Sequence, residues 1–103
     1  AKEMILGGVQ INAQRAYEIG LVNKVLPADK LLEEAKKFAK RLAGLPAFAL
    51  KMAKNAINYG FDMSLDNASL LEIGCIAQCF STEDQKEGMK AFLEKRKPNF
   101  KGK

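Results

Sequence analysis

The sequence predicts an all-α chain without a sheet, and three observations support this. Apolar residues recur at spacings of three and four over most of its length. Glycine and proline stand where these periodic segments end, and asparagine, aspartate, serine or threonine stand where most of them begin. The one segment that could be extended is residues 21–26, where β-branched residues stand three apart directly before Pro27. Two short and four longer helical segments follow from this pattern.

The two short helices are expected at the start of the chain. The first covers residues 2–6 and ends at a pair of glycines. The second covers residues 13–19, with Asn12 as its N-cap and Gly20 as its C-terminal stop. Residues 21–26 are too few and too mixed to be more than an extended connector or one edge strand.

The third and fourth helices are amphipathic. Asp29 is the expected N-cap of the third, and Gly44 ends it. The apolar residues of the third helix recur at spacings of four, three and four: Leu31, Ala35, Phe38 and Leu42. Pro46 suits the first turn of the fourth helix, which stops at Gly60.

The fifth helix is expected from Ser64 to Phe80 and carries both cysteines. Gly74 weakens it by roughly 1 kcal/mol relative to alanine and is expected to mark close packing against a neighbour. Cys75 and Cys79 share a face, but a metal site needs more ligands and the chain contains no histidine. We interpret them as reduced thiols packed as small apolar residues, which fits a cytoplasmic or organelle-matrix protein.

The sixth helix is expected to begin with a capping box and to end before a proline. The Thr82 hydroxyl can accept from the Gln85 N–H while the Gln85 side chain reaches back. The residue before Pro98 is pushed out of helical geometry, so the helix should run to Arg96 or Lys97.

The net charge of +5 is concentrated at the end of the chain. Residues 1–85 hold ten basic and ten acidic side chains, whereas residues 86–103 hold seven and two. This basic end is a solvated helix end, a nucleic-acid surface or a site for a phosphate-bearing small ligand. Nucleic acid is disfavoured because only Phe92 and Phe100 stand among the charges. For a small ligand, Phe92 and Lys95 are three apart on one helix face, so a ring could meet adenine and an ammonium a phosphate.

Catalytic constellations are missing from the sequence. Without histidine there is no Ser-His-Asp or Cys-His arrangement, and no glycine-rich run has phosphate-loop spacing. Glu72 lies between Leu71 and Ile73, where burial would make it a candidate acid–base group. A surface or interface ion pair is the favoured interpretation of Glu72, because the sequence places no second acid–base group beside it.

Residues 81–103 closely resemble the C-terminus of the crotonase (enoyl-CoA hydratase) family. The resemblance runs over the whole chain in a consistent order and spacing, through blocks at residues 1–8, 11–16, 20–25, 31–35, 54–58, 82–84, 87–89, 91–92 and 94–98. It implies the helical C-terminal region of a crotonase-like α/β spiral fold. Residues 1–26 would then end the core region, and residues 27–103 would form a helical trimerisation region.

The resemblance also implies a function. Members of the family that resemble this chain are lyases of fatty-acid metabolism that hydrate 2-enoyl-CoA reversibly to 3-hydroxyacyl-CoA, with the coenzyme A thioester as substrate and no further cofactor. The short-chain hydratase branch is the nearest in pattern. Homo-oligomers, as trimers or dimers of trimers, are implied, with no nucleic-acid or membrane partner. The expected location is cytoplasmic, or the mitochondrial matrix in a eukaryote.

Only a binding role can be carried over to particular residues. The family places an aromatic residue and a lysine of its final helix near the coenzyme A nucleotide, and the matching positions are Phe92 and Lys95. The oxyanion-hole segment and the two catalytic glutamates match no position, so we assign no catalytic residue. Since the chain starts at Ala1 with a helical pattern already under way, we expect an inactive piece of a longer enzyme. The alternative is a self-standing helical interaction module with a basic, anion-binding tail.

Overall fold

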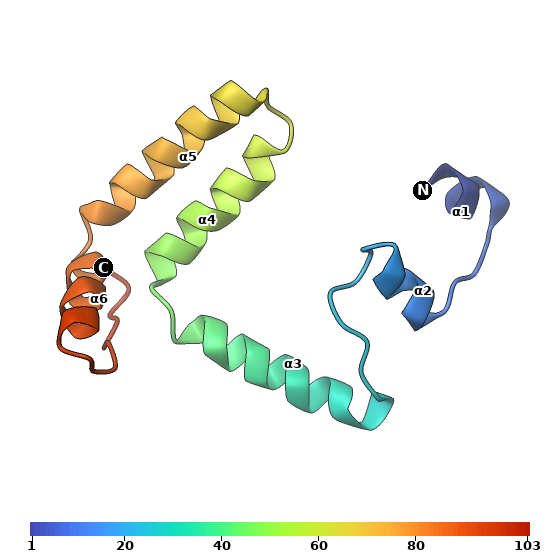
Figure 1. Ribbon diagram of the computed structural model, residues 1–103, viewed down its shortest axis with the longest axis horizontal. Helices are drawn as coiled ribbons and strands as arrows, with labels where there is room; N and C mark the ends of the chain where they lie inside the picture. Colours follow the sequence, from blue (N-terminus) through green and yellow to red (C-terminus); the bar gives the residue numbers. More distant parts are fainter. The chain divides into compact units, whose positions relative to one another are not determined.

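Six α-helices and no β-strand make up the chain in the computed structural model, which describes all residues 1–103 (Figure 1). The predicted all-α class is confirmed. The chain divides into two compact units, residues 1–36 and 37–103. The predicted regions 1–26 and 27–103 refer to the fold of a longer protein, and that division stays a prediction. None of the six helices combines the length and apolar composition needed to cross a bilayer.

The first unit begins with two short helices, α1 (Lys2–Gly7) and α2 (Ala13–Glu18). Asn12 caps α2 as predicted, because its side chain accepts a hydrogen bond from the Arg15 backbone N–H at 2.7 Å. The chain leaves α2 through Gly20, whose φ of 74° is the left-handed conformation expected of a C-terminal stop.

Helix α3 (Ala28–Ala43) follows an irregular stretch, so residues 21–26 form a connector rather than an edge strand. The prediction that Asp29 caps α3 is wrong. The helix begins before Asp29, because the Lys30 N–H donates to the Pro27 carbonyl oxygen at 3.0 Å and closes a turn there. Asp29 lies in the first turn, where its carboxylate faces the positive end of the helix dipole.

In the second unit, α4 (Ala47–Gly60) and α5 (Leu65–Phe80) pack side by side and run in opposite directions (Figure 1). Their close approach is at Gly60, where an added Cβ would lie 3.5 Å from the Ala68 Cβ. Gly74, the predicted packing point, has no atom within 4 Å of where its Cβ would be. The expectation for Gly74 is therefore wrong within this chain.

Local capping at the starts of the later helices largely follows the sequence. The Ser64 hydroxyl accepts from the Asn67 N–H at 3.4 Å, and the Thr82 hydroxyl accepts from the Gln85 N–H at 3.1 Å. The return bond from the Gln85 side chain, the other half of the capping box, does not form. Pro46 stands at the N-cap of α4 rather than inside its first turn.

Helix α6 (Glu83–Leu93) ends earlier than the sequence indicated. The expected end at Arg96 or Lys97, set by Pro98, is wrong. The helix stops because Lys95 takes a positive φ of 53°, which turns the chain out of the helix before the proline can act.

The chain buries few of its apolar side chains against itself. Ala16, Met52, Cys75 and Ala91 are the buried apolar residues. Large apolar side chains on α3, α4 and α5 are exposed, among them Leu31, Leu32, Phe38, Ile57, Leu65, Leu70, Ile73, Ile76 and Phe80. Both cysteines are free thiols, as predicted, with Cys75 buried and Cys79 half-buried.

Candidate functional site

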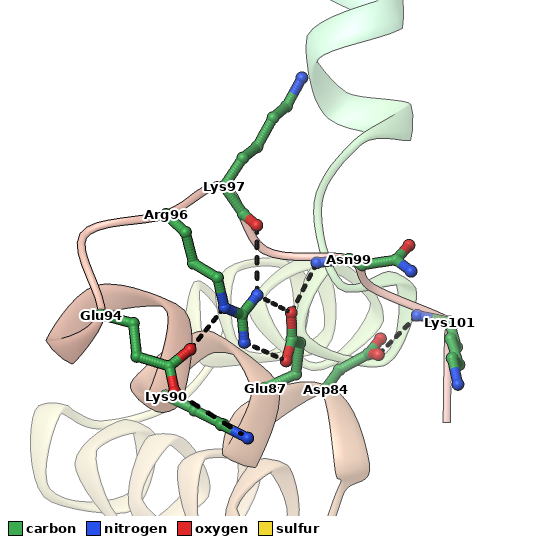
Figure 2. Close-up of polar contacts among 8 residues, drawn as sticks. All are labelled: Asp84, Glu87, Lys90, Glu94, Arg96, Lys97, Asn99 and Lys101. Atoms are coloured by element: carbon green, nitrogen blue, oxygen red, sulfur yellow. Dashed lines mark hydrogen bonds and ion pairs between the residues drawn. The ribbon is translucent and has the colours of Figure 1, made fainter.

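The end of the chain folds back along α6 and is held by two carboxylates of that helix (Figure 2). We call residues 94–103 the tail, and the tail together with Asp84 and Glu87 the clasp. The Asp84 carboxylate accepts from the backbone N–H groups of Lys101 at 2.7 Å and Gly102 at 2.8 Å. The Asp84 N–H in turn donates to the Lys103 carbonyl oxygen at 2.9 Å. Asp84 is only 2% exposed, so these charge-assisted bonds are well shielded from water.

The second carboxylate of the clasp, Glu87, is bound by Arg96. The Arg96 guanidinium donates two parallel hydrogen bonds to Glu87, at 2.7 and 2.9 Å. The Asn99 backbone N–H donates to the same carboxylate at 2.8 Å. The hydrogen bonds from Arg96, and then that from Asn99, lower the pKa of the Glu87 carboxyl from 4.5 to about 2. The same pair raises the already high pKa of Arg96.

Arg96 also makes contacts within the tail. Its Nε donates to the Glu94 carboxylate at 2.6 Å, and its guanidinium donates to the Lys97 carbonyl oxygen at 3.3 Å. The Lys90 ammonium lies 3.9 Å from the other oxygen of Glu94. Both carboxylates of residues 86–103, Glu87 and Glu94, are thus occupied by cations of that same segment (Figure 2).

An apolar contact completes the clasp. An added Cβ at Gly88 would lie 3.4 Å from Cε1 of the Phe100 ring, so the ring lies over this glycine of α6. Ala91, one turn further along the helix, is 1% exposed. A small residue at position 88 therefore lets the aromatic ring of the tail pack closely on the helix.

Lys95 stands where helices usually end in glycine. Its N–H donates to the Phe92 carbonyl oxygen at 3.2 Å, and the Arg96 N–H donates to the Ala91 carbonyl oxygen at 3.0 Å. This pair of bonds is the Schellman motif, which requires a left-handed residue at Lys95. That conformation costs an L-residue about 1–2 kcal/mol relative to glycine. The backbone at Lys95 is therefore strained. The residues before and after it, Glu94 and Arg96, both take part in the hydrogen bonds of the clasp.

The two residues expected to bind a ligand lie at this helix end, but not as the spacing suggested. Phe92 is on α6, whereas Lys95 is outside the helix, so they do not share a helix face. A backbone hydrogen bond nevertheless joins them. Phe92 is 79% exposed, so it is not a core residue of this chain. The ammonium groups of Lys95, Lys97 and Lys101 make no hydrogen bond or ion pair.

The structure does not support a functional role for the other candidate residues. Glu72 is exposed on α5, so burial does not single it out as an acid–base group. No group of three or more histidine, cysteine, aspartate or glutamate side chains is arranged to hold a metal ion. Sequence reasoning missed the clasp, because its ion pair joins residues nine apart and the Asp84 carboxylate binds backbone groups seventeen and eighteen residues away. No helical spacing rule connects such positions.

The fold and the site together define a helical unit that ends in an ordered basic tail. All 103 residues match the model of the enoyl-CoA hydratase/isomerase family. The chain therefore belongs to the enoyl-CoA hydratase/isomerase family. The resemblance inferred from the sequence is confirmed, and a match over the whole chain does not favour the alternative of a self-standing helical module.

Individual relatives agree with this assignment. The chain is 46% identical over 100 residues to a crotonyl-CoA hydratase of Syntrophomonas wolfei, covering 97% of this chain and 38% of the relative. It is 46% identical over 101 residues to a mitochondrial enoyl-CoA hydratase of Pongo abelii, covering 98% and 35%. The crystal structure of an enoyl-CoA hydratase from Bacillus anthracis superposes with a TM-score of 0.95 at 38% identity, covering 99% and 40%. The chain thus spans less than half the length of these proteins.

Proposed function

We propose that this chain supplies the C-terminal helical region of a short-chain enoyl-CoA hydratase. The enzyme would add water reversibly to a 2-enoyl-CoA to give a 3-hydroxyacyl-CoA, with the thioester as substrate and no further cofactor. The observation that carries the proposal is the family match over all 103 residues. Relatives named crotonyl-CoA hydratase and short-chain-enoyl-CoA hydratase, at 46% and 43% identity, support the choice of reaction.

Within that enzyme, Phe92 and Lys95 are proposed to hold the nucleotide of coenzyme A. An aromatic ring that is 79% exposed offers a face on which adenine can stack. The Lys95 ammonium has no ion-pair partner, so its charge is available to a phosphate. These contacts are far from the reacting double bond and equally strong in ground and transition states. They should lower KM without raising kcat. We assign the chain no catalytic residue.

The exposed apolar faces fit a role in assembly. Large exposed apolar patches rarely persist on monomers, so the exposed apolar side chains of α3, α4 and α5 are expected to pack against other protein surfaces. We propose that they pack against the rest of the enzyme and neighbouring subunits of a homotrimer or a dimer of trimers. A location in the cytoplasm, or in the mitochondrial matrix of a eukaryote, is proposed with it, since one relative is named mitochondrial.

The binding role is tested by steady-state kinetics of the full-length enzyme with crotonyl-CoA. A charge-assisted contact contributes about 1.5–3 kcal/mol, and solvation at a helix end roughly halves this. Lys95→Ala should therefore raise KM roughly three- to tenfold and leave kcat nearly unchanged. The increase should shrink as salt rises. Phe92→Ala should raise KM with a weaker salt dependence, because its contribution is stacking.

Two controls make this test specific. Crotonyl-pantetheine, a thioester without the nucleotide, should show no change of KM in either variant. Lys54→Ala removes an exposed charge of α4, outside the clasp, and should leave the KM for crotonyl-CoA unchanged. An unchanged KM for crotonyl-CoA in both Lys95→Ala and Phe92→Ala at low salt would remove the nucleotide-binding role.

A further inference from the structure

We propose that Arg96 and Glu87 are positioning residues for the nucleotide site, because their ion pair holds the backbone at Lys95 left-handed and so fixes where the Lys95 ammonium is presented to a phosphate. This inference rests on the proposed binding of the coenzyme A nucleotide by Lys95. Neither Arg96 nor Glu87 touches the ligand in this proposal. Their effect reaches it only through Lys95.

The starting observation is the backbone of Lys95. It is the one residue other than glycine with a positive φ; the others are Gly8, Gly20 and Gly102. Gly20 closes α2 with the same pair of hydrogen bonds that Lys95 makes at the end of α6. Glycine would occupy position 95 without strain, as it does at position 20. A strained residue persists where its surroundings over-determine it, and such residues cluster at functional sites.

The surroundings of Lys95 are supplied by Arg96. The guanidinium of Arg96 binds Glu94, which precedes Lys95, and Glu87, which lies two turns back on α6. The Arg96 guanidinium therefore links the residue before Lys95 to the residue after it, and both to Glu87 (Figure 2). The Asn99 N–H binds the same Glu87 carboxylate and fixes the path of the chain beyond it. Backbone bonds at an exposed helix end fray readily, and this side-chain clasp restrains them.

The clasp also determines which cation is available. Arg96 and Glu87 neutralise one another, and Glu94 takes a second edge of the guanidinium. Lys95 keeps its charge unpaired. An electrostatic role of Glu87 and a positioning role consequently predict opposite effects of removing its charge. Without positioning, Glu87→Gln adds net positive charge beside the site and should lower the KM for an anionic ligand.

The test is the KM of full-length Glu87→Gln for crotonyl-CoA. Positioning predicts a rise of about two- to fivefold with kcat nearly unchanged, smaller than for Lys95→Ala because the ammonium remains. Crotonyl-pantetheine should show no rise. Glu83→Gln removes a carboxylate from the first turn of the same helix that has no ion-pair partner, so its KM should stay equal or fall.

A more conservative substitution separates the positioning effect from a general loss of folding. Arg96→Lys keeps the charge but cannot form the two-pronged contact with Glu87, and it should also raise the KM for crotonyl-CoA. In Glu87→Gln and in Arg96→Lys the backbone amide of residue 96 should exchange faster with solvent, while that of Leu21 at the end of α2 should not change.

The outcomes separate the two proposals. An unchanged or lowered KM in Glu87→Gln and Arg96→Lys, with a raised KM in Lys95→Ala, overturns the positioning role and leaves the nucleotide site standing. An equal rise with crotonyl-pantetheine shows a general structural defect and also overturns it. An unchanged KM in Lys95→Ala removes the phosphate contact of Lys95, and the positioning role with it; the nucleotide site itself falls only if Phe92→Ala also leaves KM unchanged.

Discussion

Replacing Lys95 with glycine should stabilise the end of α6 and weaken nucleotide binding at the same time. Lys95 has a φ of 53°, which costs an L-residue about 1–2 kcal/mol. Glycine removes this strain but loses about 0.4–1 kcal/mol more conformational entropy on folding. The net stabilisation is about 0.5–1 kcal/mol, which changes the local opening equilibrium about two- to fivefold. The lost ammonium should raise the KM for crotonyl-CoA as in Lys95→Ala.

Amide hydrogen exchange measures this local opening directly. The Arg96 N–H, which donates to the Ala91 carbonyl oxygen at 3.0 Å, reports on the closure of the helix end. Its exchange, corrected for the intrinsic rate, should slow about two- to fivefold in Lys95→Gly. Lys95→Ala is the matched variant, because it loses the ammonium but keeps the Cβ and the strain. The Leu21 amide, bound in the same way after Gly20, should exchange alike in both.

Equal or faster exchange of the Arg96 amide in Lys95→Gly than in Lys95→Ala would contradict this prediction. Strain at Lys95 would then be absent or relieved elsewhere. The coupling of stability to binding fails separately if the glycine variant keeps the original KM. In that case the Lys95 ammonium would not contact the nucleotide.

Three further predictions concern the clasp. The pKa of Glu87 is lowered to about 2, so its stabilisation is fully present above pH 4.5 and is lost as the pH falls toward 2; the Asn99 amide shift should follow this titration, and a midpoint near 4.5 would contradict it. Asp84→Asn removes one of the two charge-assisted hydrogen bonds to the tail and should destabilise the attachment of the tail by about 1.5–3 kcal/mol. Trypsin should then cleave the tail faster than in the control Asp66→Asn, which changes an exposed carboxylate, and equal rates would count against the buried contact. Gly88→Ala places its Cβ at ordinary contact distance, 3.4 Å, from Phe100 and should stabilise α6 by about 0.5–1 kcal/mol in urea unfolding; a destabilised variant would show that the ring cannot tolerate a methyl group.

Most helix limits could be predicted because the signals are local. Asn12, Ser64 and Thr82 each accept the capping hydrogen bond that their sequence positions suggested. The start of α3 could not be predicted as well, since the Lys30 N–H finds the Pro27 carbonyl oxygen and moves Asp29 into the helix. Capping competes with continued helix formation there, and the energies differ by amounts that sequence pattern does not resolve.

The end of α6 and the clasp depend on contacts that the sequence pattern does not contain. Pro98 suggested a later end, but α6 ends at Leu93 and the chain turns away at Lys95, whose strained backbone lies beside the Arg96–Glu87 pair. Phe92 is an exposed aromatic ring, and its role in binding stays a prediction. The expectation that Phe92 shares a helix face with Lys95 was wrong, because residues three apart share a face only where both lie within the helix.

Photoaffinity labelling shows directly whether α6 and its tail contact the coenzyme A nucleotide. The full-length enzyme would be irradiated with an azidoadenine analogue of crotonyl-CoA, and labelled tryptic peptides would be located by mass spectrometry. We predict a label in the peptide 91–95, which contains Phe92 and Lys95, that excess coenzyme A suppresses and Phe92→Ala weakens. A label suppressed by coenzyme A but lying wholly outside residues 83–103 would contradict the claim.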